Sequence, residues 1–157
     1  MKCNCCGKDL GEFTFDIAFQ LPDAIWALSE AERQQRAQFD SDLSRLDDRY
    51  FIRGVAFVPV QGTDRQFGWG IWVEIPPENF FHYAKNFNSD NRGTASFSGK
   101  AANRLLHYPD TCGITMQVQL GDQTQRPIFT STDPQHPLTL EQANGIPLER
   151  VHAYNDR

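Results

Sequence analysis

The sequence predicts a single α+β domain with a mainly antiparallel sheet, built from two hairpins and flanked by short helices. The length of 157 residues is about that of one domain. Two pairs of β-rich segments are each joined by a short, turn-rich loop, and the helical segments around them are short. Because the chain has no internal repeat, low-complexity run or linker, we assign residues 1–157 to one domain.

The first third of the chain predicts a strand followed by a helix. Residues 13–19 alternate apolar with polar or small side chains, which is the period of a half-buried strand. Ser29 is a favourable N-cap, and Glu32 stands three residues later as its capping-box partner. We therefore expect a helix from about residue 30 to residue 39.

The centre of the chain predicts an antiparallel hairpin. Residues 50–60 and 66–75 are rich in β-branched and aromatic side chains, and the intervening loop contains a glycine and an aspartate. We place Phe57 opposite Trp69, which makes a cross-strand aromatic pair on the buried face. The other face then carries several glycines, and such a face lets another group approach the backbone closely.

Arg53 is the one charged residue on the apolar face of this predicted hairpin. A guanidinium group cannot lose its charge to suit an apolar setting. We therefore expect Arg53 to be mostly buried and paired with Asp42, Asp47 or Asp110, each in a loop that could close over the end of the sheet. A contact with an anionic ligand is the alternative interpretation.

The second half of the chain predicts short helices around another hairpin. Pro77 suits the first turn of a helix, and the alternation at residues 113–120 is that of a strand. The expected elements are a helix at 78–87, a short strand at 94–98, a helix at 100–108, a hairpin of 113–120 with 126–132, and short helices at 139–144 and 147–154.

Charge and composition restrict the classes of function. The net charge of -5 makes the chain a poor partner for a phosphate backbone, so we expect no nucleic-acid binding. No stretch of about eighteen apolar residues predicts a membrane span, and no apolar segment near the N-terminus resembles a secretory signal. We expect a cytoplasmic protein with reduced thiols.

The N-terminal cysteines are weak metal candidates. Cys3 and Cys6 have the spacing of half a zinc knuckle, but a tetrahedral site requires a second pair and the chain has no other Cys-x-x-Cys. The segment 93–100 resembles a phosphate-binding loop, but its spacing is wrong by one residue and Ala101 replaces the metal-binding hydroxyl residue. No catalytic motif is recognisable, and we expect no cofactor.

Several segments, taken together, carry a family resemblance. They are Cys3-x-x-Cys6-Gly7, Ser41-Asp42-Leu43, Phe51-Ile52-Arg53-Gly54, the segment 67–73, Asn79-Phe80, Tyr108-Pro109-Asp110-Thr111, Arg126-Pro127, His136-Pro137-Leu138 and Gly145-Ile146. In this order they resemble the bacterial family called domain of unknown function 2199, over nearly the whole chain. The resemblance implies no activity, because the family has none assigned.

The resemblance does bear on zinc. The family pattern has a histidine three positions after Cys-x-x-Cys-Gly and a cysteine after Ser-Asp-Leu, which together would complete a Cys₃His site. In this chain the two positions are occupied by Leu10 and Ser44. We therefore predict a protein without stoichiometric zinc, which elemental analysis would test.

These observations favour a non-catalytic binding or interaction module, since the chain is acidic, rich in aromatic residues and without a catalytic motif. One concrete version is a small acidic protein that neutralises a toxin partner. The alternative is an enzyme or small-ligand-binding protein with a site around Arg53, Trp72 and Glu74. A deep pocket with convergent polar groups would favour the alternative, and an exposed aromatic patch would favour binding. The oligomeric state stays open.

Overall fold

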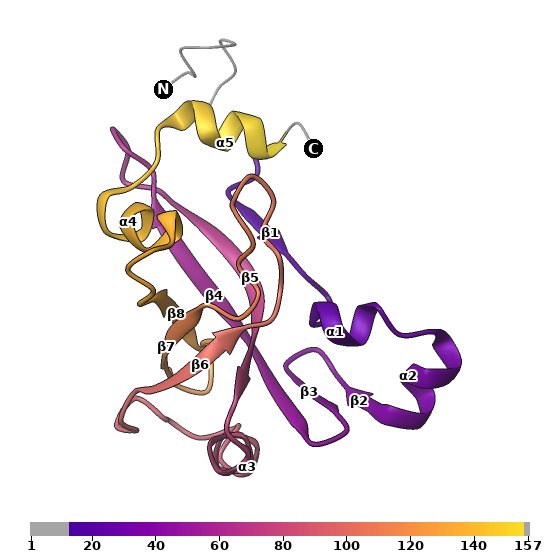
Figure 1. Ribbon diagram of the computed structural model, residues 1–157. Coiled ribbons are helices and arrows are strands. Elements are labelled where there is room, and N and C mark those ends of the chain that lie inside the picture. The colour runs from indigo at the N-terminus through magenta and orange to yellow at the C-terminus, as the bar shows by residue number, and fades with distance from the viewer. Residues whose placement is uncertain (1–12, 156–157) are drawn as a thin grey trace.

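The computed structural model describes residues 13–155, and its strands form one continuous sheet (Figure 1). The strands of the described chain are β1 (Asp16–Ala18), β2 (Ala37–Phe39), β3 (Leu43–Leu46), β4 (Arg49–Pro59), β5 (Gln66–Ile75), β6 (Phe97–Ala101), β7 (Thr115–Gln119) and β8 (Ile128–Ser131). The helices are α1 (Asp23–Trp26), α2 (Glu30–Arg36), α3 (Pro77–Lys85), α4 (Pro137–Asn144) and α5 (Leu148–Asn155). The α+β class is confirmed.

Five of the strands close into a barrel. Strands β4 to β8 pair in the order β4-β5-β6-β7-β8, and β8 then returns to β4. The pairs within this ring are antiparallel except for the closing one, which is parallel and joins Val55 to Ile128. Both predicted hairpins exist, β4 with β5 and β7 with β8, but they are parts of one ring.

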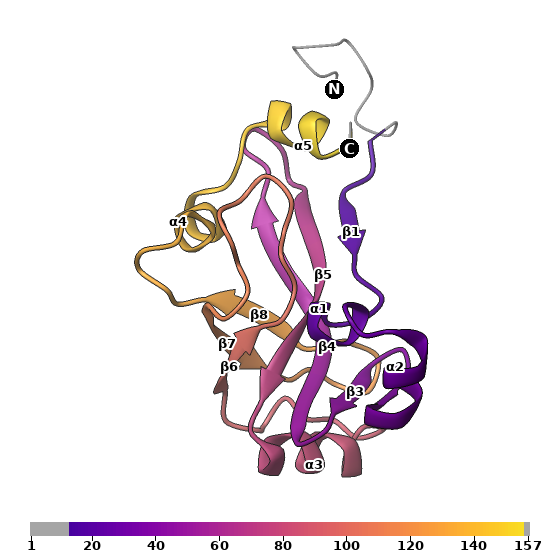
Figure 2. The same cartoon turned by 45° about the vertical axis from the view of Figure 1, so that its right-hand side comes forward.

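The two long strands exchange neighbours halfway along their length. The first part of β4 pairs with β3, and β8 joins β4 at Val55. The first part of β5 pairs with β1, and its last part pairs with β6. Strands β1 and β2 are therefore the two edges of the sheet. They lie on the side of the β4–β5 hairpin away from the barrel, as Figure 1 shows for both strands and Figure 2 for β1.

The predicted register of the central hairpin is wrong by one residue. Trp69 lies opposite Ala56, and Phe57 lies opposite Gly68. Trp69 is consequently buried inside the barrel, whereas Phe57 faces outward and keeps 36% of its surface exposed. The physical reason is volume, because a narrow barrel accommodates a large side chain best beside a small one. A Phe–Trp pair across these strands would overfill the interior.

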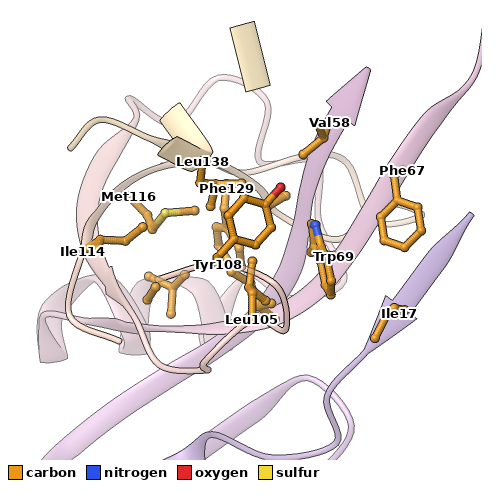
Figure 3. Packing of buried hydrophobic residues seen from close by; sticks show 14 of the residues in the cluster. Ile17, Val58, Phe67, Trp69, Leu105, Tyr108, Ile114, Met116, Phe129 and Leu138 are labelled. Carbon is orange, nitrogen blue, oxygen red and sulfur yellow. The ribbon is translucent and has the colours of Figure 1, made fainter. Parts of the chain in front are cut away.

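The core has two parts on opposite faces of the β4–β5 hairpin. The main cluster fills the barrel and includes Trp69, Tyr108, Met116 and Phe129, whose side chains converge in Figure 3. The second cluster lies on the outer face, beneath α1 and β2. Its buried members are Leu21, Ile25, Ala37, Leu46, Phe51, Trp72 and Ala102. Both faces of the hairpin are thus covered by other parts of the chain.

The first predicted helix is confirmed but shorter than expected. Ser29 and Glu32 form the predicted capping box at the start of α2. The helix ends at Arg36, and the next three residues form β2 instead of a further helical turn. Helices α3, α4 and α5 and the second hairpin are confirmed with small shifts in their bounds, and the strand expected at 94–98 begins at Phe97.

The helix predicted at residues 100–108 is wrong, because side chains there bond to the backbone. The Asn103 side chain accepts a hydrogen bond from the Trp72 backbone N–H at 2.8 Å. The Thr111 hydroxyl donates to the Asn103 carbonyl at 2.6 Å and accepts from the Leu105 N–H at 2.9 Å. These bonds satisfy backbone groups in a set of turns, which short polar side chains favour over a helix. Among the described residues, no helix has the length and hydropathy of a membrane span.

Candidate functional site

The structure brings Arg53 and Trp72 together, although the expected register placed them on opposite faces. The two residues are direct partners across β4 and β5, on the outer face of the hairpin. The Arg53 Cζ atom lies 5.9 Å from the centre of the Trp72 ring, a distance at which a cation and an aromatic face attract each other. Glu74 follows on the same face, opposite Phe51.

Trp72 has a structural role in this arrangement. Its side chain is fully buried in the second cluster, between the sheet and the segment that includes α1. The indole Nε1–H donates a hydrogen bond to the Phe19 carbonyl at 3.1 Å, so its one polar atom is satisfied. Because the chain itself covers the ring, Trp72 offers no surface to a ligand in this structure.

No carboxylate is paired with Arg53 among the described residues, so the predicted buried ion pair is wrong. Arg53 is half-buried, and its guanidinium donates to the Ser41 carbonyl at 3.2 Å while its Nε makes no hydrogen bond. The three expected carboxylates have other partners: Asp42 accepts from Arg126, Asp47 from Arg36, and Asp110 from the Cys112 N–H. Burial and then the Arg126 charge lower the pKa of Arg53, against the opposing effect of Asp42.

Glu74 lines a wide cleft, which we call the charged cleft. Its carboxylate accepts from Arg49 at 2.8 Å, and this hydrogen bond raises the pKa of Arg49. Lys100 is its cross-strand neighbour on β6. The charged cleft has a volume of about 630 Å³ and is lined by Asp48, Arg49, Tyr50, Glu74, Ile75, Pro76, Pro77, Ser98, Gly99, Lys100 and Thr115.

An aromatic groove adjoins the charged cleft and shares Tyr50 with it. The groove has a volume of about 320 Å³ and is lined by Gln38, Phe39, Asp40, Leu43, Ser44, Arg45, Tyr50, Phe80 and Phe81. The ring centres of Phe80 and Phe81 lie 4.9 Å and 5.2 Å from that of Tyr50. Phe39 and Phe81 remain 49% and 56% exposed, so two large apolar side chains on the groove are in contact with water.

Sequence analysis missed this groove, although one signal for it was present. Phe80 and Phe81 are adjacent in a segment that was correctly predicted as a helix. Neighbouring residues on a helix point in directions about 100° apart, so both rings cannot face the same core. Phe80 is buried, and Phe81 is the one left exposed. The contribution of β2 could not be foreseen, because residues 37–39 were expected to be helical.

Two of the segments that carry the family resemblance maintain the fold. The His136 Nδ1 accepts a hydrogen bond from the Leu138 N–H at the start of α4, and its Nε2 lies 3.1 Å from the Pro109 carbonyl, to which it can donate. Tyr108 accepts from the Tyr154 hydroxyl at 3.1 Å. Burial, followed by this hydrogen bond, raises the pKa of Tyr108. Both ring nitrogens of His136 are thus engaged, and its imidazole joins two loops.

The structure provides no metal site in the part that it describes. No group of three or more His, Cys, Asp or Glu side chains among residues 13–155 could bind a metal ion. Cys3, Cys6 and Leu10 lie outside the described residues. Ser44 is described, and it is buried in β3 with a hydroxyl that makes no hydrogen bond. The absence of stoichiometric zinc stays a prediction.

Comparison with known proteins identifies a family without an assigned activity. The family model described as uncharacterized protein conserved in bacteria (DUF2199) matches residues 2–146. Comparisons with curated proteins and with solved structures gave no match. Since the family model covers well over half of the 157 residues, the chain belongs to the DUF2199 family of proteins conserved in bacteria.

Proposed function

We propose that this protein is a non-catalytic binding module that captures a protein partner through the aromatic groove. The observation that carries the proposal is the exposure of Phe39 and Phe81, at 49% and 56%, on a groove of about 320 Å³. Large aromatic side chains are enriched in protein interfaces, where a few of them contribute most of the binding energy. Here they lie beside the charged cleft, which could bind polar groups at the rim of an interface.

The edge of the sheet supports an extended segment as the part of the partner that binds. Strand β2 lies at the end of the strand order, so one of its sides has no neighbouring strand. Phe39 belongs to this strand, and Phe81 lies on α3 across the groove. A partner strand could pair with β2 while one of its apolar side chains enters the groove between the two aromatic rings.

The charge of the chain favours a basic partner. The net charge of -5 would accelerate association with a positively charged protein and would make binding weaker at high salt. A toxin neutralised by this protein remains one version of the proposal. A small-ligand or enzymatic site around Arg53, Trp72 and Glu74 has less support, since the chain covers Trp72 and Arg49 pairs with Glu74.

Affinity capture from a bacterium that encodes the protein would test the proposal. We expect Phe81→Ser and Phe39→Ser to reduce recovery of a specific partner about tenfold or more, because each removes an exposed aromatic anchor. Leu140→Ser is the matched control, since Leu140 is 65% exposed on α4, at a distance from α3 (Figure 1). Equal recovery by all four proteins, with unchanged melting temperatures, would contradict the proposal.

A further inference from the structure

We propose that a separate polar cavity beside α3 binds a carboxylate group through Tyr83 and Arg126. This polar cavity has a volume of about 370 Å³. It is lined by Asp42, Tyr83, Phe87, Asn91, Asp122, Gln123, Thr124, Gln125 and Arg126. Its residues come from the turn between β2 and β3, from α3 and the loop after it, and from the turn between β7 and β8. The site is distinct from the aromatic groove and does not depend on the function proposed for it.

Hydrogen bonds within the chain form the walls of the cavity in advance. Asn91 is buried, and its side-chain amide donates to the Asn86 carbonyl at 3.0 Å and the Ser89 carbonyl at 3.2 Å. The Asn91 backbone N–H donates to the Gly121 carbonyl at 3.0 Å, which joins the loop after α3 to the turn between β7 and β8. A ligand would therefore meet walls that need little further ordering, which lowers the entropic cost of binding.

Tyr83 lines this cavity, and its hydroxyl is unused within the described chain. The residue is only 5% exposed, yet its hydroxyl makes no hydrogen bond with any described residue. Burial, followed by the charge of Asp42, raises the pKa of Tyr83 to about 12, against the opposing effect of Arg126. The hydroxyl stays protonated at neutral pH, so it can donate a hydrogen bond, and Asp42 and Arg126 line the same cavity as Tyr83.

Arg126 supplies the second set of donors. Its Nε–H donates to Asp42 Oδ1 at 2.8 Å, which fixes the orientation of the guanidinium group. Its two terminal amino groups make no hydrogen bond with the described residues, and 45% of the side chain is exposed. A guanidinium group offers parallel N–H donors whose spacing matches the two oxygens of a carboxylate. The Nε–H of Arg126 is thus occupied, whereas the N–H groups of its two terminal nitrogens are available to a ligand.

The carboxylates near the cavity already accept hydrogen bonds from within the chain. Asp42 accepts from Arg126 through one oxygen and from the Ser41 hydroxyl at 2.9 Å through the other, and Arg53 is a second cation nearby. Asp122 accepts two hydrogen bonds from Thr124 through Oδ1, at 2.8 Å and 2.6 Å. Tyr83 and Arg126 still have unpartnered O–H and N–H groups. These groups donate hydrogen bonds, and an anion, which accepts them, is the ligand that they would bind best.

The apolar wall of the cavity narrows the class of ligand. Phe87 is half-buried, and its ring centre lies 5.5 Å from that of Tyr83. A carboxylate that is attached to a small apolar or aromatic group would contact this wall while its oxygens meet the donors. The ligand is either a free organic acid or an acidic side chain of a bound protein, and the two share the same chemistry.

Titration with phenylacetate, followed by chemical shifts in NMR spectra of the full chain, tests the site. We expect saturable binding to the wild type and weaker binding of phenylacetamide, which lacks the charge. Tyr83→Phe and Arg126→Gln should each weaken phenylacetate binding about tenfold or more, since each removes a hydrogen bond to a charged group. Tyr83→Phe should leave the melting temperature unchanged, because the lost hydroxyl has no partner in the chain.

Two controls separate this site from the aromatic groove. Tyr50→Phe removes another tyrosine hydroxyl outside the polar cavity, and Phe81→Ser alters the groove, so both should bind phenylacetate as the wild type does. If Tyr83→Phe also abolishes capture of a protein partner, the carboxylate belongs to that partner; if capture is unchanged, it belongs to a free acid. The proposal is overturned if phenylacetate binds no better than phenylacetamide, or if Tyr83→Phe binds it as tightly as the wild type.

Discussion

Replacing Ser44 with cysteine should stabilise the protein. Ser44 lies in β3 opposite Phe51 and keeps only 2% of its surface exposed. It shares a face of the strand with Leu46, and both Leu46 and Phe51 belong to the second apolar cluster. The Ser44 hydroxyl is buried there without a hydrogen-bond partner. Folding therefore removes this hydroxyl from water, and no hydrogen bond within the protein replaces those that the hydroxyl made with water.

The size of the effect follows from that lost solvation. Burying a hydroxyl group without a partner costs about 1–3 kcal/mol, whereas a thiol behaves as a small apolar group. We expect Ser44→Cys to raise the free energy of unfolding by about 1 kcal/mol, which corresponds to roughly 2–4 °C in melting temperature for a domain of this size. Ser44→Ala should gain less, because it removes the polar atom but leaves a small void.

Ser131 provides the matched control for this substitution. It is also buried, at 3% exposure, but its hydroxyl lies 2.6 Å from the Thr139 hydroxyl and bonds with it. Ser131→Cys should lower the free energy of unfolding by about 1 kcal/mol, since a thiol is a weak hydrogen-bonding group. Urea unfolding under reducing conditions measures both variants. The reasoning is refuted if Ser44→Cys is no more stable than the wild type while Ser131→Cys is destabilised as expected.

Three further predictions concern the hairpin, Arg53 and the described cysteine. Gly54→Ala should lower the free energy of unfolding by at least about 2 kcal/mol, because its Cβ would lie 2.6 Å from the Phe129 ring; Gly93→Ala, with no atom within 4 Å, should be nearly neutral in thermal unfolding. Arg53→Ala should lower the free energy of unfolding by about 1–2 kcal/mol, the value of a hydrogen bond and packed methylenes. A decrease above about 3 kcal/mol would contradict this and would indicate a buried ion pair. Burial, followed by a hydrogen bond to an aspartate, raises the pKa of Cys112 to about 12. Because only the thiolate reacts, alkylation of Cys112, measured by peptide mass spectrometry, should be slow at pH 8 and should accelerate up to about pH 12. Fast labelling at pH 8 would contradict this.

The elements with strong local signals could be predicted from the sequence. The capping box of Ser29 and Glu32, the proline at the start of α3 and the alternation in β7 all depend on neighbouring residues, and the corresponding elements are confirmed. The turns at residues 102–111 could not be predicted, because they depend on the contact between Asn103 and the distant Trp72 backbone. Closure of the barrel also depends on contacts between distant residues.

The prediction of a site at Arg53, Trp72 and Glu74 depended on the register of the central hairpin, which was wrong by one residue. The residues Arg53, Trp72 and Glu74 were selected as unusual on their strands, but a shift by one residue changes which strand faces are shared. The corrected pairing places all three on one face and shows that Trp72 belongs to a second core. Tyr83 carried no signal in the sequence, and Arg126 was noted only in the Arg126-Pro127 segment of the family resemblance, which gave it no role. Only the fold brings them together beside one cavity.

The parallel contact that closes the barrel has a consequence for the order of folding. The β4–β5 and β7–β8 hairpins join residues that are close in sequence, so each can form with little loss of chain entropy. The closing contact, in which the Val55 N–H donates to the Pro127 carbonyl at 2.9 Å, requires a much longer loop to be ordered. We expect this seam to form after the rate-limiting step, so substitutions there would accelerate unfolding and leave the refolding rate nearly unchanged.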